Sequence, residues 1–571
     1  MSVTALRRLQ APLENGAILA VPPLAETARL LADNRHRFSQ PRPDLLGRSW
    51  SEIRKQAQRE ALAAAKEYLT QAGEPLPISN EASFFVAGHQ PDLFHPGVWI
   101  KNFALNGLAK SYGSTPLNLI VDSDAAKTTS IRVPALTDAA TFRAGSVSAG
   151  SEPPGAHASG SEFGDKQIDP DRVKLLTIPI DRWTREIPYE ELRVADEATL
   201  ANVEDQVMSI VQAWGFTSMF GSFWQTVLRQ GQRTDILGER LAAARRSLER
   251  KWNCHNWELP VSRLCQTPTF AWFACHLLSN LSRFQVIYNN TVRAYRERYG
   301  LRSRSHPVPE LAAKNGWLET PFWAWRANQP RRRPLLARQA GAAIELRLEN
   351  ETLGELPENE SDQTVAAWQE LEASGIKIRS RALMTTLFAR LFLGDLFIHG
   401  IGGGKYDELT NEIIRRFYDL EPPAYMILSG TLHLPLPIFP IRPEDCRRLA
   451  RALRDLHWNP QRHLDEKLQR QRGEQGEGDL AILKAELIAR QADDLVQRRQ
   501  RFQMLRELTE KLRPLVSDRE RVLKEGLTQC QRKVQANRIL QSREYAFCLY
   551  PEETLRPFCT QSLDKSVVSS P

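Results

Sequence analysis

The chain has 571 residues, too many for one hydrophobic core, and this length predicts two to four domains. Hydrophobic residues make up 42% and charged residues 25% of the composition, as in ordinary globular proteins. The net charge of +8 is spread over basic and acidic residues that mostly interleave. This pattern does not favour nucleic acid as a partner, but it is compatible with a small anionic ligand.

Seven cysteines are scattered along the chain, and no C-x-x-C pair occurs among them. We therefore expect reduced thiols in a cytoplasmic protein, with neither a disulfide framework nor a metal site. The first residues lack the apolar run of a secretory signal, and no segment approaches eighteen uninterrupted apolar residues. Export and membrane spanning are therefore not predicted.

Residues 1–80 are expected to form an N-terminal arm that packs on the core. The arm contains short apolar runs such as Ala17–Val21. A stretch rich in Ala, Glu, Lys and Gln follows and predicts a helix over Ser51–Ala72. This helix is expected to cover the first sheet.

The stretch Phe84–Lys101, FFVAGHQPDLFHPGVWIK, joins a predicted strand to a predicted helix. Its apolar start, Phe84–Val86, is typical of a buried central strand, and Gly88 permits a sharp exit from it. A Pro-Gly pair then opens a helix predicted over Val98–Lys110. Free N–H groups and the positive end of the helix dipole favour an anion at such a start. The polar residues expected to bind or act there are His89, Gln90, Asp92, His95 and Lys101.

A second apolar run, Leu117–Val121, is followed at once by Asp122 and Asp124. Strand, helix and strand in this order predict a βαβ unit with parallel strands whose carboxyl ends meet. Because ligands bind beyond those ends, Asp122 and Asp124 are expected beside His89, and these three residues are the predicted catalytic group. Two alternatives are open: the carboxylates cap a turn, or the histidines only satisfy loop carbonyls.

Residues 81–440 are predicted to form the core, which two segments interrupt. Residues 143–171 are rich in Gly, Ser, Pro and Ala and are expected to be a disordered loop. Residues 189–300 have apolar side chains at helical spacing and are expected to be a mainly helical insertion. The run Arg331–Arg333 either clamps a phosphate or carboxylate or forms a solvated turn.

A glycine-rich stretch follows the apolar run Leu391–His399, which is expected to be a buried strand or helix end. It reads GIGGGKYDE over residues 400–408 and precedes a helix predicted over Glu408–Phe417. This is not the P-loop pattern, but glycines let backbone N–H groups close on an anion. We expect it to form the second wall of the anion site. Its predicted anion-binding residues are His399, Gly402, Gly403, Gly404, Lys405, Asp407 and Glu408.

Residues 441–545 are predicted to form a hairpin of two antiparallel α-helices with a coiled-coil seam. The seam is a seven-residue repeat of apolar side chains: Ile488, Leu495, Phe502, Val516, Leu523 and Cys530. A row of this length must be covered, so the hairpin either packs on the rest of the chain or forms a homodimer. Residues 546–571 are expected to be a docking segment and a polar tail.

Three stretches resemble the cysteine ligases of bacillithiol biosynthesis. They are VAGHQPDLFHPGVWIKNFALNGLAK, LNLIVDSDAAKTTSIRVP and FIHGIGGGKYDELTNEIIRRFYDLEPPAYMILSG. By position in the family's motifs, His89 and Gln90 match paired glutamines and Lys101 matches a helix lysine. Asp122 and Asp124 match an acidic pair, and Gly402–Glu408 matches a glycine-rich loop. The chain has GHQ where the family has GQQ, and it lacks the histidine found between the acidic residues.

The resemblance implies a Rossmann-like parallel-sheet core, helical insertions and a C-terminal antiparallel coiled coil. It also implies a ligase that adds cysteine to the amine of an amino sugar. We therefore expect an enzyme that joins an amine to an activated carboxyl group, with a small anionic or amino-sugar-like substrate. The cofactor is left open, ATP or another nucleotide being one option. The alternative is a non-catalytic scaffold with a degenerate core. Catalysis would need His89, Asp122 and Lys405 to face one pocket.

Overall fold

The computed structural model describes residues 9–40, 42, 44–80, 83–137, 168–182, 186–358, 361–464, 477–491 and 494–568. The fold is mixed α/β, and the chain forms two compact units. Unit 1 comprises Met1–Val133, Leu176–Pro435 and Arg543–Pro571, and unit 2 comprises Pro134–Leu175 and Leu436–Ser542. Most of the segment predicted to be a disordered loop, residues 143–171, lies outside the described residues.

Unit 1 is built on a six-stranded, mostly parallel sheet. Its strands in spatial order are β1 (Ile18–Val21), β14 (Tyr425–Gly430), β13 (Leu396–His399), β2 (Phe84–His89), β3 (Thr115–Ile120) and β6 (Trp257–Pro260). Only the edge strand β1, which comes from the predicted N-terminal arm, runs antiparallel to its neighbour. The central strands are apolar because helices cover both faces, as is usual for parallel sheets.

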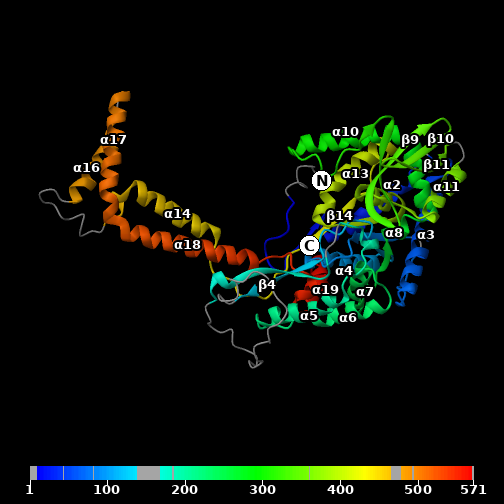
Figure 1. Ribbon diagram of the computed structural model, residues 1–571, viewed down its shortest axis with the longest axis horizontal. Helices are drawn as coiled ribbons and strands as arrows, with labels where there is room; N and C mark the ends of the chain where they lie inside the picture. The colour runs from blue at the N-terminus through cyan, green and yellow to red at the C-terminus, as the bar shows by residue number, and fades with distance from the viewer. Residues whose placement is uncertain are drawn as a thin grey trace. The chain divides into compact units, whose positions relative to one another are not determined.

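The predicted strand–helix–strand unit is confirmed. Strands β2 and β3 are parallel neighbours, paired from Phe84 with Thr115 to His89 with Ile120. Helix α4 (Pro96–Ser111) connects them, has proline at its first position and packs beside α19 (Glu552–Val568) (Figure 1). The buried side chains of Phe84 and its neighbours on β2 explain why this run forms a central strand.

A second parallel connection, through helix α13 (Ile401–Tyr418), joins β13 to β14. From the adjacent strands β2 and β13, the chain therefore leaves in opposite directions across the sheet. This arrangement is a topological switch point, and it opens a crevice beyond the carboxyl ends of the two strands. The glycine run does not form a loop as predicted, because α13 begins at Ile401 and includes Gly402–Gly404 in its first turn.

A second, antiparallel sheet in unit 1 was not predicted. Its strands in spatial order are β11 (Glu351–Pro357), β10 (Ala343–Leu348), β9 (Gln329–Ala340), β8 (Trp317–Arg326) and β12 (Ile376–Ser380), with β7 (Ala313–Lys314) pairing with β8. In β10, buried residues alternate with half-buried ones, as expected of a strand with one covered face. The run Arg331–Arg333 therefore belongs to strand β9.

Helices fill the remaining layers of unit 1. They are α2 (Thr27–Ser39), α3 (Trp50–Gln71), α5 (Glu197–Gln212), α6 (Phe220–Arg229), α7 (Leu237–Lys251), α8 (Val261–Leu264), α9 (Pro268–Ser279), α10 (Leu281–Tyr299), α11 (Ser361–Ala373), α12 (Ala382–Phe388) and the π-helix η6 (Ala389–Leu393). Residues 189–300 are mainly helical as predicted, but they also contain strand β6. In α3, Ile53, Ala57, Ala61 and Ala65 recur every four residues, and this stripe is buried.

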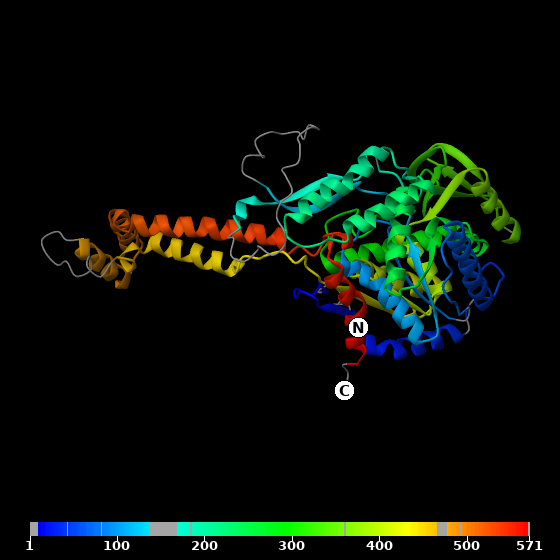
Figure 2. The ribbon, with the colours of Figure 1, turned by 90° about the horizontal axis from the view of Figure 1, so that it is seen from below.

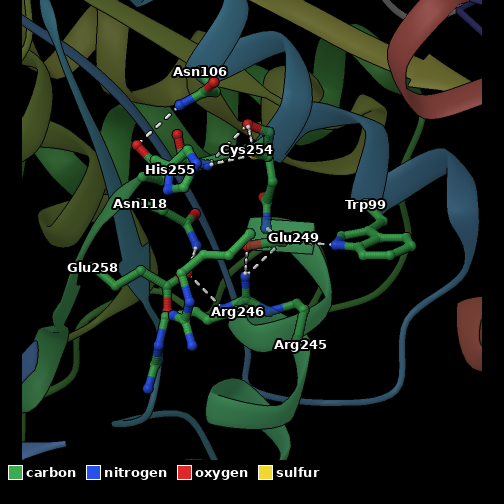
Figure 3. Close-up of polar contacts among 12 residues, drawn as sticks. Trp99, Asn106, Asn118, Arg245, Arg246, Glu249, Cys254, His255 and Glu258 are labelled. Atoms are coloured by element: carbon green, nitrogen blue, oxygen red, sulfur yellow. Dashed lines mark hydrogen bonds and ion pairs between the residues drawn. The ribbon is translucent and has the colours of Figure 1, made fainter. Parts of the chain in front are cut away.

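A buried cluster of charges fixes α7 against the sheet and against α4 (Figure 3). Glu258, on β6, accepts hydrogen bonds from Arg245 Nη2 at 2.6 Å and Arg246 Nη1 at 2.7 Å. Glu249 accepts one from Trp99 Nε1 of α4 at 2.6 Å. Since these groups are buried, each charge needs its partner, and the cluster holds α4 in a defined position.

Unit 2 contains four α-helices within its described residues: α14 (Pro443–Trp458), α16 (Glu477–Ala489), α17 (Leu495–Leu512) and α18 (Ser517–Leu540). Helices α14 and α18 lie side by side (Figures 1 and 2). They are antiparallel, because the turn after α14 contacts the turn before α18. Their link is a disulfide between Cys446 and Cys530. The expectation that all thiols are reduced is therefore wrong for this pair.

The predicted seven-residue seam is not buried along its whole length. Val516 and Cys530 are buried, but Leu495 is 79% and Phe502 66% exposed. A coiled coil that runs through all six positions is thus not observed.

Strands β4 (Ser130–Leu136) and β5 (Val173–Pro179) form a further two-stranded sheet.

Candidate functional site

A cavity of about 530 Å³ lies in unit 1 at the switch point of the parallel sheet. Eight of the predicted site residues line it: His89, Gln90, His95, Lys101, Asp124, His399, Gly402 and Gly403. Strand β8, strand β9 and the start of α12 supply the opposite wall with Trp323, Arg332 and Arg381. We refer to this space as the main cavity.

The first turns of α4 and α13 both border the main cavity, where Gly97 and Gly402 line it. The first N–H groups of a helix have no partner within it, so a helix start favours a negative charge. In α4, Pro96 has no N–H group and Val98 donates to the carbonyl oxygen of His95 at 2.9 Å, which leaves the N–H group of Gly97. Gly97 is required by a close approach, because a Cβ there would lie 2.1 Å from the carbonyl oxygen of Gly430. Ser429 Oγ also donates to the carbonyl oxygen of Gly97 at 3.2 Å, which fixes the start of α4 beside the end of β14.

Lys101 places a cation between the two strands of the switch point. Its Nζ donates at 3.0 Å to the carbonyl oxygen of Gly88, the last residue but one of β2. Its Cε lies 4.0 Å from where a Cβ of Gly400 would stand, beside the end of β13. Burial lowers the pKa of Lys101 to about 8. The ammonium group is therefore charged at neutral pH and poorly solvated, a state that an anion in the cavity would stabilise.

His89 is neutral at physiological pH. Burial, followed by the nearby charge of Lys101, lowers its pKa to about 3. The Nδ1 atom lies 3.3 Å from the carbonyl oxygen of Gln90, which can only accept a hydrogen bond. Nδ1 therefore carries the proton and Nε2 has the lone pair, so His89 can accept a hydrogen bond from a ligand.

Asp124 is the predicted carboxylate that reaches the main cavity. Its Oδ2 accepts from Gln90 Nε2 at 3.0 Å, and its Oδ1 accepts from Arg332 Nη1 at 2.9 Å. Arg332 also lies over the ring of Trp323, with 5.2 Å between the guanidinium carbon and the ring centroid. This chain of contacts joins the loop after β2 to the second sheet.

His399 enters the cavity wall from the end of β13 and is only 6% exposed. Its Nε2 lies 2.9 Å from Oδ2 of Asp407, and the same oxygen accepts from Arg390 Nη1 at 2.6 Å. Burial lowers the pKa of His399, although Asp407 opposes this effect. The imidazole is thus neutral and held in one orientation by a carboxylate.

His95 and Arg543 meet at the start of α4. Arg543 Nη2 lies 3.4 Å from His95 Nε2 and donates to Ser429 Oγ at 3.2 Å. Burial, partly opposed by Glu544, lowers the pKa of His95 to about 4. Arg543 thereby adds a second cation to the helix-start end of the cavity.

Six predicted residues do not line the main cavity. Asp122 instead accepts hydrogen bonds from the N–H and hydroxyl groups of Ser262, so it caps the start of α8. The turn-capping alternative does not describe Asp122, because its side chain bonds a segment 140 residues further along the chain. Asp92 accepts from Tyr189 Oη at 3.1 Å, and Glu408 accepts from Tyr299 Oη at 2.6 Å.

The other three lie on α13. Gly404 packs against strand β14, where a Cβ would be 2.4 Å from side-chain atoms of Ile427. Lys405 is half-buried outside the lining, and its carbonyl oxygen faces Tyr295 Oη at 3.3 Å. Asp407 lies behind His399, which it orients. The helical path of the glycine run accounts for these differences, because successive residues of a helix point in different directions.

Sequence reasoning did not single out Trp323, Arg381 and Arg543 for the site. Arg332 was considered only as part of the run Arg331–Arg333. Arg381 lies with its guanidinium carbon 4.0 Å from the ring centroid of Trp323 and donates to Glu319 Oε1 at 2.6 Å. The density of tryptophan and arginine between residues 317 and 333 is the sequence feature that indicates this wall of the cavity. No sequence feature indicates Arg543, because it follows a long helical segment.

The site combines two helix starts with Lys101, Arg332, Arg381 and Arg543, so it suits an anionic ligand. In the ranges that the structure describes, no group of three or more His, Cys, Asp or Glu side chains could hold a metal ion. Nor does any helix there have the length and apolar composition needed to cross a bilayer.

A comparison with models of known protein families gives no match. A comparison with curated proteins gives no significant match either.

Proposed function

We propose that this protein is an enzyme that joins an amine to an activated carboxyl group, in the main cavity. The observation that supports this proposal most strongly is the convergence of two helix starts, Lys101 and Arg543 on one crevice at the switch point. Such a site can hold the phosphoryl group of an acyl phosphate or acyl adenylate.

The reaction would proceed by attack of the amine nitrogen on the carbonyl carbon of the activated acid. The C–N bond forms, the C–O bond to the phosphoryl group breaks, and the nitrogen loses one proton. Lys101, the N–H group of Gly97 and those of the first turn of α13 would stabilise the negative charge on the leaving phosphoryl group. His89 Nε2, as a hydrogen-bond acceptor, would orient the incoming amine.

Asp124 would support this arrangement by holding Gln90 and Arg332 on either side of the cavity. Asp122, which sequence reasoning placed with the catalytic residues, has a structural role as the cap of α8. The substrate class that fits the cations is a small anionic or amino-sugar-like molecule, with ATP or another nucleotide as the activating group. Cysteine as the acid would follow from the family resemblance.

A hydroxamate assay tests this proposal. The protein is incubated with ATP, hydroxylamine as the amine, and single amino acids or dicarboxylic acids as the acid. We expect a hydroxamate to form together with stoichiometric release of phosphate or pyrophosphate. Lys101→Met should abolish the reaction, because its cation is at the centre of the anion site. Lys55→Met is the matched control, since Lys55 is an exposed lysine of α3 outside the cavity.

A scaffold without catalytic activity is the second candidate. It is favoured by one observation, that Asp122 and Lys405 lie outside the cavity in which catalysis was expected to need them. A scaffold would form no hydroxamate with any acid. The enzyme proposal is wrong if, in addition, ATP raises the thermal stability of wild type no more than it raises that of Lys101→Met.

Two finer features of the architecture belong to this proposal. We propose that the parallel sheet is Rossmann-like, which the switch point between β2 and β13 supports. We also propose that the helices of unit 2 contain a coiled coil that forms a homodimer, which the exposed apolar side chains of Leu495 and Phe502 on α17 support. Light scattering on the full-length chain tests the homodimer: a monomer, or a dimer that persists in the double variant Leu495→Glu/Phe502→Glu, would contradict it.

A further inference from the structure

His399 has its proton position fixed by its neighbours. Arg390 and His399 lower the pKa of Asp407 although burial alone would raise it, so Asp407 is an ionised carboxylate that only accepts hydrogen bonds. The 2.9 Å contact between His399 Nε2 and Asp407 Oδ2 therefore places the proton on Nε2. The lone pair of His399 is consequently on Nδ1.

Nδ1 lies beside a position that only glycine leaves open. A Cβ on Gly403 would stand 2.8 Å from this atom, closer than side chains ordinarily approach. Gly403 is exposed and lines the main cavity together with His399. The lone pair of His399 thus adjoins the cavity at the first turn of α13, where the leaving phosphoryl group is proposed to bind.

Of the three histidines that line the cavity, His89 and His399 differ in what lies behind them. His399 is backed by the carboxylate of Asp407, which stabilises an imidazolium ion. The charge of Lys101 lowers the pKa of both histidines, but His89 is backed by a carbonyl oxygen and has no carboxylate to oppose this effect. A proton released in the cavity is therefore better accepted by His399 than by His89.

We propose that His399 is the catalytic base that takes the proton from the attacking amine, and that Asp407 is its positioning residue. This inference rests on the proposed function. As the C–N bond forms and the C–O bond to the phosphoryl group breaks, the amine proton passes to Nδ1 of His399. It then passes to the departing phosphate, which returns the imidazole to its neutral form. Asp407 keeps its negative charge throughout, because Arg390 holds it.

The first experiment needs no substrate. Diethyl pyrocarbonate acylates the accessible lone pair of neutral histidines, and peptide mapping by mass spectrometry locates the modified residue. In the full-length protein at neutral pH, we expect His399 to be modified and inorganic phosphate to slow the modification. Gly403→Ala should slow it several-fold because the new Cβ blocks Nδ1, whereas Gly402→Ala should not, since no atom lies within 4 Å of a Cβ there. Both alanines suit a helix, so both variants should fold.

The second experiment uses the hydroxamate assay. His399→Gln should lower kcat by roughly 10²–10⁴-fold with little change in KM, the size of effect typical of a lost general base. Asp407→Asn should move the pH profile of kcat, which a purely structural role would not do; if this variant fails to fold, Gly403→Ala gives the decisive comparison. The charged and titratable groups near His399 that would also affect the profile are Asp407, Arg390, Lys101 and Tyr425.

The outcomes separate this inference from the proposed function. Hydroxamate formation that is unchanged in His399→Gln, or equal modification of His399 in the two alanine variants, would overturn the role of His399 while the ligase proposal stands. Absence of hydroxamate in wild type would refute the proposed function and this inference together. Modification of His399 in that case would still establish its accessible lone pair.

Discussion

Glu258→Gln tests whether the buried charge cluster beside α4 holds unit 1 together. Glu258 is fully buried and accepts from Arg245 at 2.6 Å, Arg246 at 2.7 Å and Asn118 Nδ2 at 2.6 Å. Glutamine preserves the shape but removes the negative charge, and its amide hydrogens cannot accept from an arginine. The buried cluster then loses one negative charge, while Arg245 and Arg246 each keep one carboxylate partner.

The expected cost follows from these contacts. Removing one partner of a buried ion pair typically costs about 3–5 kcal/mol, and each lost hydrogen bond to a charged group contributes about 1.5–3 kcal/mol of this. Arg245 keeps Glu249 and Arg246 keeps Glu74, so the effect should not exceed that range. We therefore expect the free energy of unfolding to fall by about 4 kcal/mol.

Urea unfolding followed by tryptophan fluorescence is a suitable assay, because every tryptophan except Trp458 lies in the sequence segments of unit 1. The matched control is Glu351→Gln, which removes the same charge from an exposed pair with Arg326 and should leave the midpoint unchanged.

The pKa of Glu258 is lowered, since its arginine partners outweigh burial. Its stabilising effect is thus present above pH 4.5 and is lost as the pH falls further. If both variants unfold at the same urea concentration, the cluster does not stabilise unit 1.

Three further predictions concern titration and the disulfide. Burial and Glu190 raise the pKa of Asp122 to about 7, so its contribution to stability is present below pH 3.8 and is lost as the pH rises through 7. Asp122→Asn should therefore match wild type in acid and be the more stable protein at pH about 8 in thermal denaturation. Phosphate affinity measured by calorimetry should fall above about pH 8 as Lys101 loses its proton, and Lys101→Met should remove this dependence. Cys446→Ser should destabilise the α14–α18 pair by about 4 kcal/mol, since the bridge spans 84 residues; unchanged proteolysis of unit 2 would contradict this.

The part of the fold that the sequence predicts well is local. An apolar run, a glycine and a Pro-Gly pair define β2 and the start of α4, and the chain order of strand, helix and strand then fixes β3 as a parallel neighbour. Eight candidate residues come together for this reason, because the carboxyl ends of neighbouring strands share one edge of the sheet.

Long-range packing decided the parts that were not predicted. Glycine is a poor helix former, so the run Gly402–Gly404 suggested a loop. The run is helical and packs closely on its surroundings: a Cβ at Gly404 would be 2.4 Å from side-chain atoms of Ile427, and a Cβ at Gly403 would stand 2.8 Å from Nδ1 of His399. Strand β6 is only four residues long and lies within a helical segment, so its pairing with β3 has no local signal.

The division of unit 1 into distant chain segments determines when the cavity can be completed during synthesis. Strand β1 emerges early but must wait for its partner β14, since Ile18 pairs with Gly430. All of α14–α18 is then translated before Arg543 leaves the ribosome and reaches His95. At about 5–20 residues per second, the nascent protein spends tens of seconds with an unpaired sheet edge and an incomplete anion site. Catalytic competence should therefore appear only after Arg543 has left the ribosome, and chaperones that shield unpaired strands should bind the nascent chain before that point.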